Sequence, residues 1–510
     1  MTDLFAFQPS PQQAAFFEFA GSGKGNGVLE ASAGAGKTTT MVQGLPRMRG
    51  TKFLGAFNAA IAGELQRRVK ADDTRSHMVT ASTMHSAGFR AWRQRHPKAQ
   101  VEPRKARKVF RQLAAERSFD VSARYIDYSC DMVGHAMNAG LGLDDKRDIE
   151  DDRKWLAISD HFDADRLLDS KVSNVTTGIR WARETFKRSL EMCSELMTFD
   201  EMLYAPLFND VPMQSFDNVL IDEAQDSNMP RILLAERMLA PGGRLFAVGD
   251  RRQSIYGFNG ADPLALQVII ERFDATVLPL SISFRCPRAV VLFAQQFVGT
   301  HIEPAPGAED GIARRIGLFP GWWQEDRPAA GDAILCRFNA PLVKQAFEFL
   351  RAGVPCRMAG RDDLGAALKQ LARRWDTVRT LDALDAQLET WLADEIEAAR
   401  KQNKPERANA ANDIVETMRA VMERCHDAGR HQVSDLVTEI GRLFVKPDQP
   451  AVLLSSIHKA KGKEWPRVYW MQVRPKFSGD RQEWQLEQEM NLKYVAATRA
   501  MRELVLVREG

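Results

Sequence analysis

Long hydrophobic runs are missing from this sequence. No apolar stretch approaches the roughly 20 residues that a helix needs to cross a bilayer. The N-terminal segment MTDLFAFQPSPQQ lacks the basic start and apolar stretch of a secretion signal. We therefore expect a protein that stays in the cytoplasm and has no membrane partner.

Cysteine is also scarce and scattered. The sequence contains no CxxC pair and no histidine cluster at metal-ligand spacing, so neither a zinc site nor a disulfide framework is indicated. We expect reduced cysteines in the core, at positions Cys130, Cys193, Cys286, Cys336, Cys356 and Cys425.

An excess of charge of one sign is absent as well. The 70 Lys and Arg residues nearly balance the 67 Asp and Glu residues, for a net charge of +3. A nucleic-acid surface, if the protein has one, must therefore be local. Hydrophobic residues make up 44% and charged residues 27%, as in soluble globular proteins. A chain of 510 residues is expected to form roughly three or four packing units.

Short apolar runs alternate with helical patterns in two separate stretches, which is typical of parallel sheets covered by helices. The first stretch holds the runs 28–29, 53–57, 78–80, 219–221, 245–248 and 277–280. The second holds the runs 333–336, 354–358, 452–455, 468–471 and 504–507. Each stretch is interrupted by a polar, helix-patterned region, from about 88 to 197 and from about 362 to 444. The sequence therefore predicts two α/β domains, each with a mainly helical insertion.

The segment ASAGAGKT, residues 31–38, follows an apolar strand and precedes a helix-compatible run, which is the context of a phosphate-binding loop. Its glycines let backbone N–H groups and the helix N-terminus face an anion. We expect Lys37 to reach the β- and γ-phosphates of a nucleotide and the Thr38 hydroxyl to bind Mg²⁺. The expected nucleotide-binding residues of the loop are Ala33, Gly34, Ala35, Gly36, Lys37, Thr38 and Thr39.

Two carboxylates follow the next apolar run, in VLIDEAQD at residues 219–226. A buried parallel strand delivers its last side chains to the ligand edge of a sheet. ATP hydrolysis needs one carboxylate on the metal ion and another that orients the attacking water. We assign the first role to Asp222 and the second to Glu223.

The block DEAQD, followed by GDRRQSIYGFNGAD at residues 249–262, resembles the UvrD/Rep family of superfamily 1 helicases. The resemblance implies that Gln253 contacts the γ-phosphate and that Tyr256 and Phe258 pack against DNA bases. The family usually has tryptophan at the position of Phe258, but phenylalanine keeps the π-face that stacks on bases. Core packing is the alternative for either aromatic side chain.

Three earlier segments resemble further blocks of the same family, in the same order. In SPQQ, Gln13 aligns best with the glutamine that reads the adenine edge, and Gln12 is the rival. Two more segments resemble the early DNA-contacting blocks, and the DNA-binding residues they imply are Phe57, Asn58, Thr83 and His85. A structural role is the alternative for a lone histidine such as His85.

Two arginines are implied to complete the ATP site from the second domain. SFRCP, residues 283–287, resembles the block whose arginine touches the γ-phosphate, which makes Arg285 a candidate. Phe284 stands where the family has a tyrosine that stacks on adenine. NLKYVAATRA, residues 491–500, resembles the block whose arginine acts as a finger on the transferring phosphoryl group, here Arg499. For an isolated arginine, a surface ion pair would be the simpler interpretation.

SSIHKAKGKEW, residues 455–465, resembles the segment that couples DNA contact to the nucleotide. The resemblance implies that Ser456, His458 and Lys459 face DNA and that Glu464 reaches the ribose. Leucine normally precedes that glutamate in the family, whereas this chain has Lys463.

Taken in order, these blocks imply two RecA-like P-loop NTPase domains with parallel sheets. The expected segments are 1–87 and 198–282 for the first motor domain, 88–197 for a helical 1B-like insertion, 283–361 and 447–510 for the second motor domain, and 362–446 for a reduced 2B-like helical insertion. Because the sequence ends at Gly510, soon after the last block, we expect no appended nuclease or docking domain in it.

The implied activity is that of an ATP-dependent DNA helicase, a monomer when unbound, that uses ATP and Mg²⁺ and translocates 3′ to 5′ on single-stranded DNA up to single-strand/duplex junctions. Two other functions stay open: a translocase that strips proteins from single strands, and a nucleotide-gated DNA-binding protein without productive unwinding. RNA also stays open as the track, because stacking and backbone contacts are sequence-tolerant. Replication, repair, recombination control and phage replication are all possible pathways.

Overall fold

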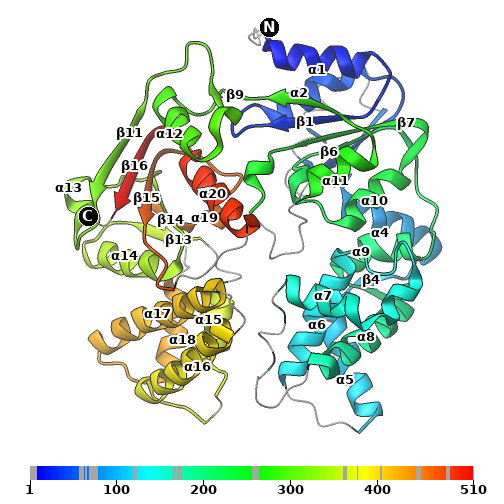
Figure 1. Cartoon of the computed structure of the whole chain (residues 1–510). Coiled ribbons are helices and arrows are strands. Elements are labelled where there is room, and N and C mark those ends of the chain that lie inside the picture. The colour runs from blue at the N-terminus through cyan, green and yellow to red at the C-terminus, as the bar shows by residue number, and fades with distance from the viewer. Residues whose placement is uncertain are drawn as a thin grey trace. The chain divides into compact units, whose positions relative to one another are not determined.

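The computed structural model describes residues 8–56, 62–63, 66–67, 78–118, 123–162, 164, 168, 175–255, 264–359, 364–375, 377–401, 405–443, 450–477 and 483–508. The chain folds into two compact units, Met1–Ser281 and Ile282–Gly510. Within the described ranges each unit is built on a six-stranded parallel sheet (Figure 1). The predicted fold class, α/β with two RecA-like domains, is confirmed.

The sheet of the first unit has the strand order β3-β2-β6-β7-β1-β8. Its strands are β1 (Gly27–Ala31), β2 (Lys52–Ala56), β3 (Val79–Thr83), β6 (Phe216–Ile221), β7 (Leu239–Gly249) and β8 (Thr276–Leu280). Each of the six predicted runs overlaps one of these strands, although residue 57 lies outside the described residues and residue 78 precedes β3. Because the strands are parallel, their carboxyl ends share one edge of the sheet, where ligands of such sheets bind.

Helices cover both faces of this sheet, so that successive residues of a strand enter opposite cores. In β7, Phe246 packs with the helices of one face, and Leu245 packs with those of the other. This two-sided burial explains the nearly continuous apolar runs of the strands. The covering helices are α1 (Pro11–Gly21) and α2 (Lys37–Gly44) on one face, and α4 (Met84–Arg95), α10 (Met229–Arg237) and α11 (Ala265–Arg272) on the other.

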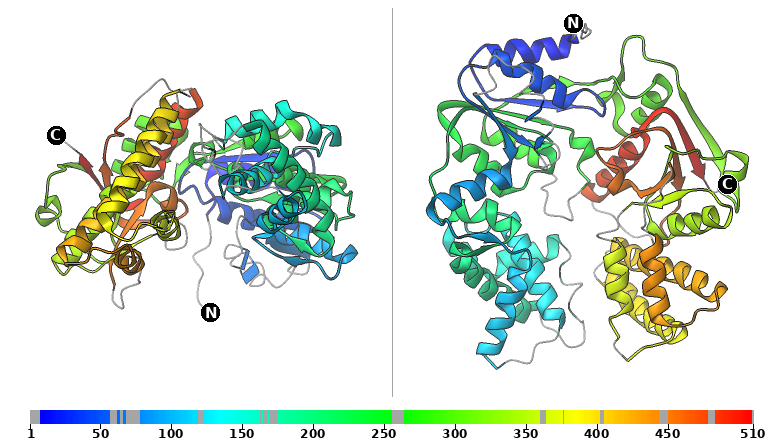
Figure 2. Two further views of the ribbon diagram at one scale, coloured as in Figure 1. Left: turned by 90° about the horizontal axis from the view of Figure 1, so that it is seen from below. Right: turned by 180° about the vertical axis from the view of Figure 1, so that it is seen from behind.

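A helical insertion lies between β3 and β6 and extends below the sheet of its own unit (Figures 1 and 2). Its elements are β4 (Gln100–Val101), α5 (Lys105–Glu116), α6 (Ala123–Asn138), α7 (Asp152–His161), α8 (Val175–Glu191), β5 (Leu196–Met197) and α9 (Phe199–Phe208). A fully buried ion pair ties three of these helices together. Lys105 Nζ lies 2.8 Å from Glu201 Oε2 and donates to the Ser189 carbonyl at 2.6 Å.

Replacing Lys105 with methionine is expected to lower the free energy of unfolding by about 3–5 kcal/mol, because the Glu201 carboxylate would then be buried without its cation. Denaturant unfolding measures the change. The double variant Lys105→Met, Glu201→Gln removes the buried charge and should recover most of the loss. A single variant no less stable than the double variant would contradict this assignment.

The sheet of the second unit has the strand order β11-β16-β15-β12-β14-β13, and all its pairings are parallel. Its strands are β11 (Ile312–Gly317), β12 (Ala333–Cys336), β13 (Cys356–Met358), β14 (Val452–Ser456), β15 (Trp465–Gln472) and β16 (Ala500–Arg508). Each of the five predicted runs overlaps one of these strands, although β13 begins at Cys356, two residues after the start of the run 354–358. Edge strand β11 was not predicted, because Arg314 and Arg315 interrupt its apolar pattern.

The helices of the second unit include a bundle, α15 to α18, below the sheet of that unit (Figures 1 and 2). Leu384 and Val421 of this bundle share one continuous core with Ile334 and Leu454 of the sheet. The helices are α12 (Arg288–Val298), α13 (Trp322–Glu325), α14 (Asn339–Arg351), α15 (Leu364–Ala372), α16 (Leu381–Lys401), α17 (Pro405–Asp427), α18 (Val433–Leu443), α19 (Ile457–Ala460) and α20 (Glu483–Ala497). Short strands β9 (Ile282–Ser283) and β10 (Glu303–Pro304) pair beside them.

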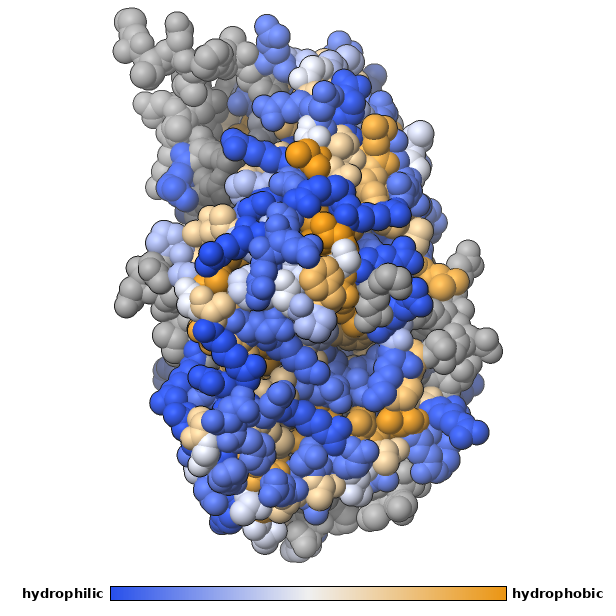
Figure 3. All heavy atoms as spheres, turned by 90° about the vertical axis from the view of Figure 1, so that its left-hand side faces the viewer, coloured by the Kyte–Doolittle hydropathy of each residue, from blue (hydrophilic) through white to orange (hydrophobic). Residues whose placement is uncertain are grey.

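The molecular surface is mainly hydrophilic on the face shown in Figure 3, where apolar side chains form small separate groups. Phe319 and Leu350 are examples of exposed apolar side chains, at 41% and 53% of their full exposure. None of the helices in the described ranges is both long and apolar enough to span a lipid bilayer.

Candidate functional site

The predicted phosphate loop connects β1 to α2 at the carboxyl edge of the first sheet. Gly34 and Gly36 have φ values of 77° and 74°, a conformation that favours glycine. The Ser32 N–H donates to the Leu280 carbonyl at 2.8 Å, which anchors the loop to β8. Ala33 and Ala35 are buried, and Thr39 is half-buried in the first turn of α2. The N-terminus of α2 therefore follows the loop directly, an arrangement that suits an anion.

Lys37 and Thr38 contact the two carboxylates that the sequence singled out. Lys37 Nζ lies 3.2 Å from Glu223 Oε2, and the Thr38 hydroxyl donates to Asp222 Oδ2 at 3.1 Å. Glu223 has a φ of 50°, in the left-handed region, immediately after β6. The strand end and the loop thus bring both parts of the predicted ATPase centre together.

Burial shapes the charges of this cluster. Burial raises the pKa of Asp222 to about 6, and the nearby Glu223 carboxylate adds to the rise. Burial opposes the charge of Lys37, but the carboxylates of Glu223, Asp250 and Asp222 outweigh it and raise its pKa. Lys37 is therefore held as a cation at the phosphate loop.

A chain of hydrogen bonds runs from the phosphate loop to Gln253. Gln225 Nε2 donates to Glu223 Oε2 at 2.6 Å, and Gln225 Oε1 accepts from the Asp250 N–H at 3.0 Å. Gln253 Nε2 donates to Asp250 Oδ2 at 2.6 Å. Sequence reasoning did not assign Gln225 or Asp250, although both lie inside the quoted blocks. They join Glu223 to the segment that carries Gln253.

Gly249 allows this bridge to form, and alanine there is expected to disrupt it. A Cβ at Gly249 would lie 2.5 Å from Gln225 Oε1 and 3.0 Å from the Gln225 backbone nitrogen. The Gly249→Ala substitution should lower the free energy of unfolding by about 1–3 kcal/mol and slow ATP hydrolysis, because the added Cβ would displace Gln225. Denaturant unfolding and phosphate release measure the two effects. Gly21→Ala is the control, because the nearest atom to a Cβ at Gly21 is 3.9 Å away. Equal stability and equal hydrolysis in the two variants would refute the claim that the bridge requires glycine at position 249.

The two candidate glutamines for adenine differ in their contacts. Gln13 Nε2 donates to the Thr40 hydroxyl of α2 at 2.9 Å and lies 3.5 Å from the position of a Cβ on Gly36. Gln12 instead exchanges two hydrogen bonds with Ser281, at 2.8 and 2.9 Å. Gln13 is therefore the one that lies against the phosphate loop.

Of the predicted DNA-contacting residues of the first unit, Thr83 and His85 lie where β3 meets α4. The Thr83 hydroxyl accepts from the Ser86 N–H at 3.1 Å and caps the helix. Burial, together with the nearby Arg231 guanidinium, lowers the pKa of His85 to about 4, so its imidazole is neutral at pH 7. The other predicted contacts, Phe57, Asn58, Tyr256 and Phe258, lie outside the described residues.

In the second unit, the candidate nucleotide-contacting residues gather around Cys286. Arg285 forms an ion pair with Glu464, and both, with Arg499, influence the ionisation of the Cys286 thiol, whose pKa burial raises. Phe284 is 55% exposed, as a side chain that stacks on a base requires. Arg285, Glu464 and Arg499, which are far apart in the sequence, are thus neighbours in the fold.

Arg499 is 1% exposed and bonded within its own unit. Its guanidinium donates to the Val495 carbonyl at 2.9 Å, the Lys463 carbonyl at 3.3 Å and the Thr498 hydroxyl at 3.1 Å. The predicted finger is therefore held between the end of α20 and the segment that precedes Glu464.

Ser456 ends β14 at the carboxyl edge of the second sheet, and His458 and Lys459 lie in α19 directly after it. Burial, together with Arg337 and Lys461, lowers the pKa of His458 to about 3. A neutral His458 leaves Lys459 as the cation among the three predicted contacts. Burial lowers the pKa of Lys463, and nearby Arg357 and Lys459 lower it further.

Two family models match the chain. The UvrD/REP helicase N-terminal domain matches residues 11–274, and the UvrD-like helicase C-terminal domain matches residues 370–509. DNA helicase II of Haemophilus influenzae is 21% identical, over 94% of this chain and 82% of its own length. The ATP-dependent DNA helicase UvrD2 of Mycobacterium tuberculosis is 24% identical, over 93% and 75%.

The first of these models covers more than half of the 510 residues and includes the phosphate loop, the acidic pair and Gln253. The second includes Glu464 and Arg499. Together with the two parallel sheets, these matches make the chain a member of the UvrD/Rep family of ATP-dependent DNA helicases.

Proposed function

We propose that this helicase moves 3′ to 5′ along single-stranded DNA and unwinds duplex at single-strand/duplex junctions. The protein that is not bound to DNA would be a monomer. The observation that carries the proposal is the hydrogen-bonded chain from Lys37 through Glu223, Gln225 and Asp250 to Gln253. A change at the phosphate loop can reach the segment after Gln253 through this chain, because each link is a direct hydrogen bond. ATP hydrolysis and DNA binding would then be coupled inside the first unit.

In the proposed mechanism, Lys37 and the loop N–H groups bind the β- and γ-phosphates. The Thr38 hydroxyl and the Asp222 carboxylate, 3.1 Å apart, are oxygen ligands of the kind that Mg²⁺ takes together with phosphate oxygens. A bound Mg²⁺ ion would neutralise charge on the phosphates. Glu223 would orient the attacking water, and Gln253 would contact the γ-phosphate.

Both units would supply the remaining groups of the ATP site. Arg285 and Arg499 would stabilise the charge that develops on the γ-phosphate, and Glu464 would bind the ribose. Gln13 would read the adenine edge and Phe284 would stack on the ring. Alternating DNA contacts would come from Thr83, His85, Ser456, His458 and Lys459, and from Phe57, Asn58, Tyr256 and Phe258.

We propose the six-segment organisation as the basis of this mechanism. Segments 1–87 and 198–282 would form the first motor domain, and segments 283–361 and 447–510 the second. The insertions 88–197 and 362–446 would serve as accessory subdomains. ATP-driven closure of the motor domains, followed by opening after hydrolysis, would produce directed steps.

Strand displacement on tailed duplexes tests the proposal. With ATP and Mg²⁺, a DNA duplex that carries a 3′ single-stranded tail should be unwound, whereas a duplex with a 5′ tail should not. An equivalent RNA tail determines whether RNA also serves as the track. Protein displacement without strand separation would favour a stripping translocase, and unwinding only from the 5′ tail would overturn the proposed direction.

A further inference from the structure

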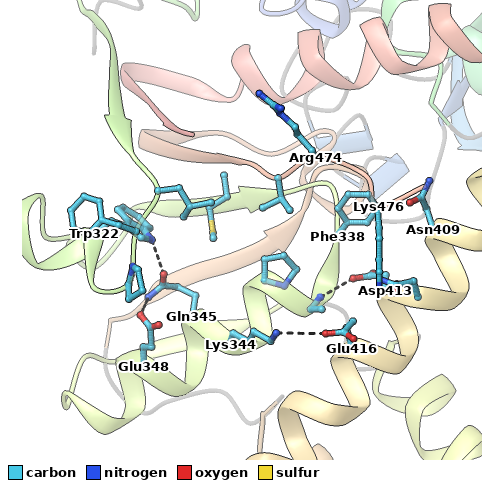
Figure 4. A pocket seen from close by; sticks show the side chains of 18 residues that line it. Trp322, Phe338, Lys344, Gln345, Glu348, Asn409, Asp413, Glu416, Arg474 and Lys476 are labelled. Atoms are coloured by element: carbon cyan, nitrogen blue, oxygen red, sulfur yellow. Dashed lines mark hydrogen bonds and ion pairs between the residues drawn. The ribbon is translucent and has the colours of Figure 1, made fainter. Parts of the chain in front are cut away.

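A cavity of about 510 Å³ opens at the carboxyl edge of the second sheet, inside the second unit (Figure 4). Its volume falls within the roughly 300–1,000 Å³ of small-ligand sites. The walls come from three chain segments that follow β11, β12 and β15, and from α17. No residue assigned above to ATP or DNA lines it.

Aromatic side chains and cations meet at this cavity. Phe319, at 41% exposure, lines it together with the half-buried Phe338. Arg474 and Lys476 are exposed and also line it. Within the described residues Arg474 has no hydrogen-bond or ion-pair partner, and Lys476 donates to the neutral Asn412 amide oxygen at 3.0 Å.

The acidic side chains of the cavity already have partners. Asp413 accepts from the N–H groups of Asn339 and Ala340, at 2.9 and 2.8 Å. Glu348 accepts from Trp323 Nε1 at 2.9 Å, and Glu416 lies 3.7 Å from Lys344 Nζ. Each carboxylate of the cavity therefore has a hydrogen-bond donor or a cation, whereas Arg474 and Lys476 have no acidic partner within the described residues and remain for an anionic ligand.

Helix α17 holds the walls of the cavity in place. Asn409 accepts from the Phe477 N–H at 3.0 Å and donates to the Phe477 carbonyl at 2.8 Å. One turn later, Asp413 caps the start of α14. Because these bonds fix both loops, a ligand would enter a site that is already formed.

The sheet register connects this cavity to the predicted DNA-contacting segment. Cys336 of β12 pairs with Ser456 on one side and with Met471 on the other. Ser456 starts the predicted DNA segment, and Met471 lines the cavity. Two strand spacings separate them, about 10 Å along the same sheet edge.

We propose that this cavity binds an unstacked nucleotide of the single-stranded track, beyond the strand that Ser456, His458 and Lys459 contact. The base would stack on Phe319 or Phe338, and Arg474 and Lys476 would bind its flanking phosphates. Aromatic stacking with a cationic groove is how proteins bind single strands without sequence preference. The inference rests on the proposed function, because it requires a single strand on this edge of the sheet.

Fluorescence titration with labelled oligothymidylate at several salt concentrations tests the phosphate contacts. Arg474→Glu with Lys476→Glu should make the dependence of log affinity on log salt shallower by about 1.4, the effect of two lost contacts to a single strand. Phe319→Ala should weaken binding by about 5- to 150-fold, the effect of one lost stacked base. The matched control for the charge reversal is the double variant Arg373→Glu, Arg379→Glu. The control for the loss of the aromatic ring is Leu350→Ala. Thermal unfolding checks that all variants fold.

Photo-cross-linking locates the base directly. An oligonucleotide that carries 5-iododeoxyuridine should form adducts in the peptides that contain Phe319 or Phe338. An unchanged salt dependence in the charge-reversed variant, or adducts confined to other peptides, would overturn this site while leaving the helicase proposal intact. Wild-type protein without affinity for single-stranded DNA would instead overturn the proposed function.

Discussion

Replacing Arg499 with lysine is expected to slow DNA-stimulated ATP hydrolysis by about 10³- to 10⁵-fold, the range for loss of an arginine finger. Lysine keeps the charge but presents a single nitrogen, whereas the guanidinium makes bonds through three nitrogens, to Val495, Lys463 and Thr498. ATP binding should persist, because Lys37 and its loop belong to the first unit and are unchanged. Single-turnover phosphate release and binding of a fluorescent ATP analogue measure the two quantities.

A structural loss at Arg499 must be separated from a catalytic one, because the side chain is buried. Unsatisfied carbonyls at Val495 and Lys463 would cost about 1–3 kcal/mol of unfolding free energy, which thermal unfolding would detect. Arg502→Ala, three residues further along and exposed, is the control and should hydrolyse ATP normally. Hydrolysis within threefold of wild type in a folded Arg499→Lys variant would refute the assigned role.

Replacing Glu223 with glutamine is expected to slow hydrolysis by about 10²- to 10⁴-fold, the usual contribution of a general base. Glutamine keeps the shape of the side chain but cannot accept a proton from water. Lys37 would lose the partner 3.2 Å from its Nζ, so it should remain available to the phosphates and ATP binding should be retained. Phosphate release and nucleotide affinity, measured on one preparation, separate the two steps.

The control for this variant is a carboxylate away from the site. Glu236, which pairs with Arg272 on the surface, can be changed to glutamine without touching the Lys37 cluster. That variant should match wild type in both assays. Unimpaired turnover in the Glu223→Gln variant would show that another residue orients the attacking water.

The predicted strands and the loop of the first unit followed from local patterns. Continuous apolar runs such as 219–221 require burial on both faces, and the GKT ending after a strand fixes the position of Lys37. The apolar run before Asp222 and Glu223 likewise predicted that both lie at the ligand edge of the sheet, where the loop also lies. Strand β11 escaped prediction because Arg314 and Arg315 interrupt its apolar pattern, and Arg314 bonds to Glu503 of β16 at 2.7 Å.

Long-range polar pairing could not be predicted from the sequence. Lys105 and Glu201 are 96 positions apart and form a buried pair only because α5 and α9 pack together. The bridge through Gln225 and Asp250 depends on the missing Cβ of Gly249, which a single sequence does not reveal. Likewise, the cavity at Phe319 exists only where β11 and β15 end at the same edge.

DNA-stimulated phosphate release, compared between the wild-type chain and Lys37→Ala, is the most direct measurement of the ATPase centre. Lys37 contacts Glu223 and is held as a cation by three carboxylates. We predict strong stimulation of the wild-type chain by single-stranded DNA and no release above background in the variant. Hydrolysis that is unchanged in Lys37→Ala would contradict the assignment of this loop as the motor's ATP site.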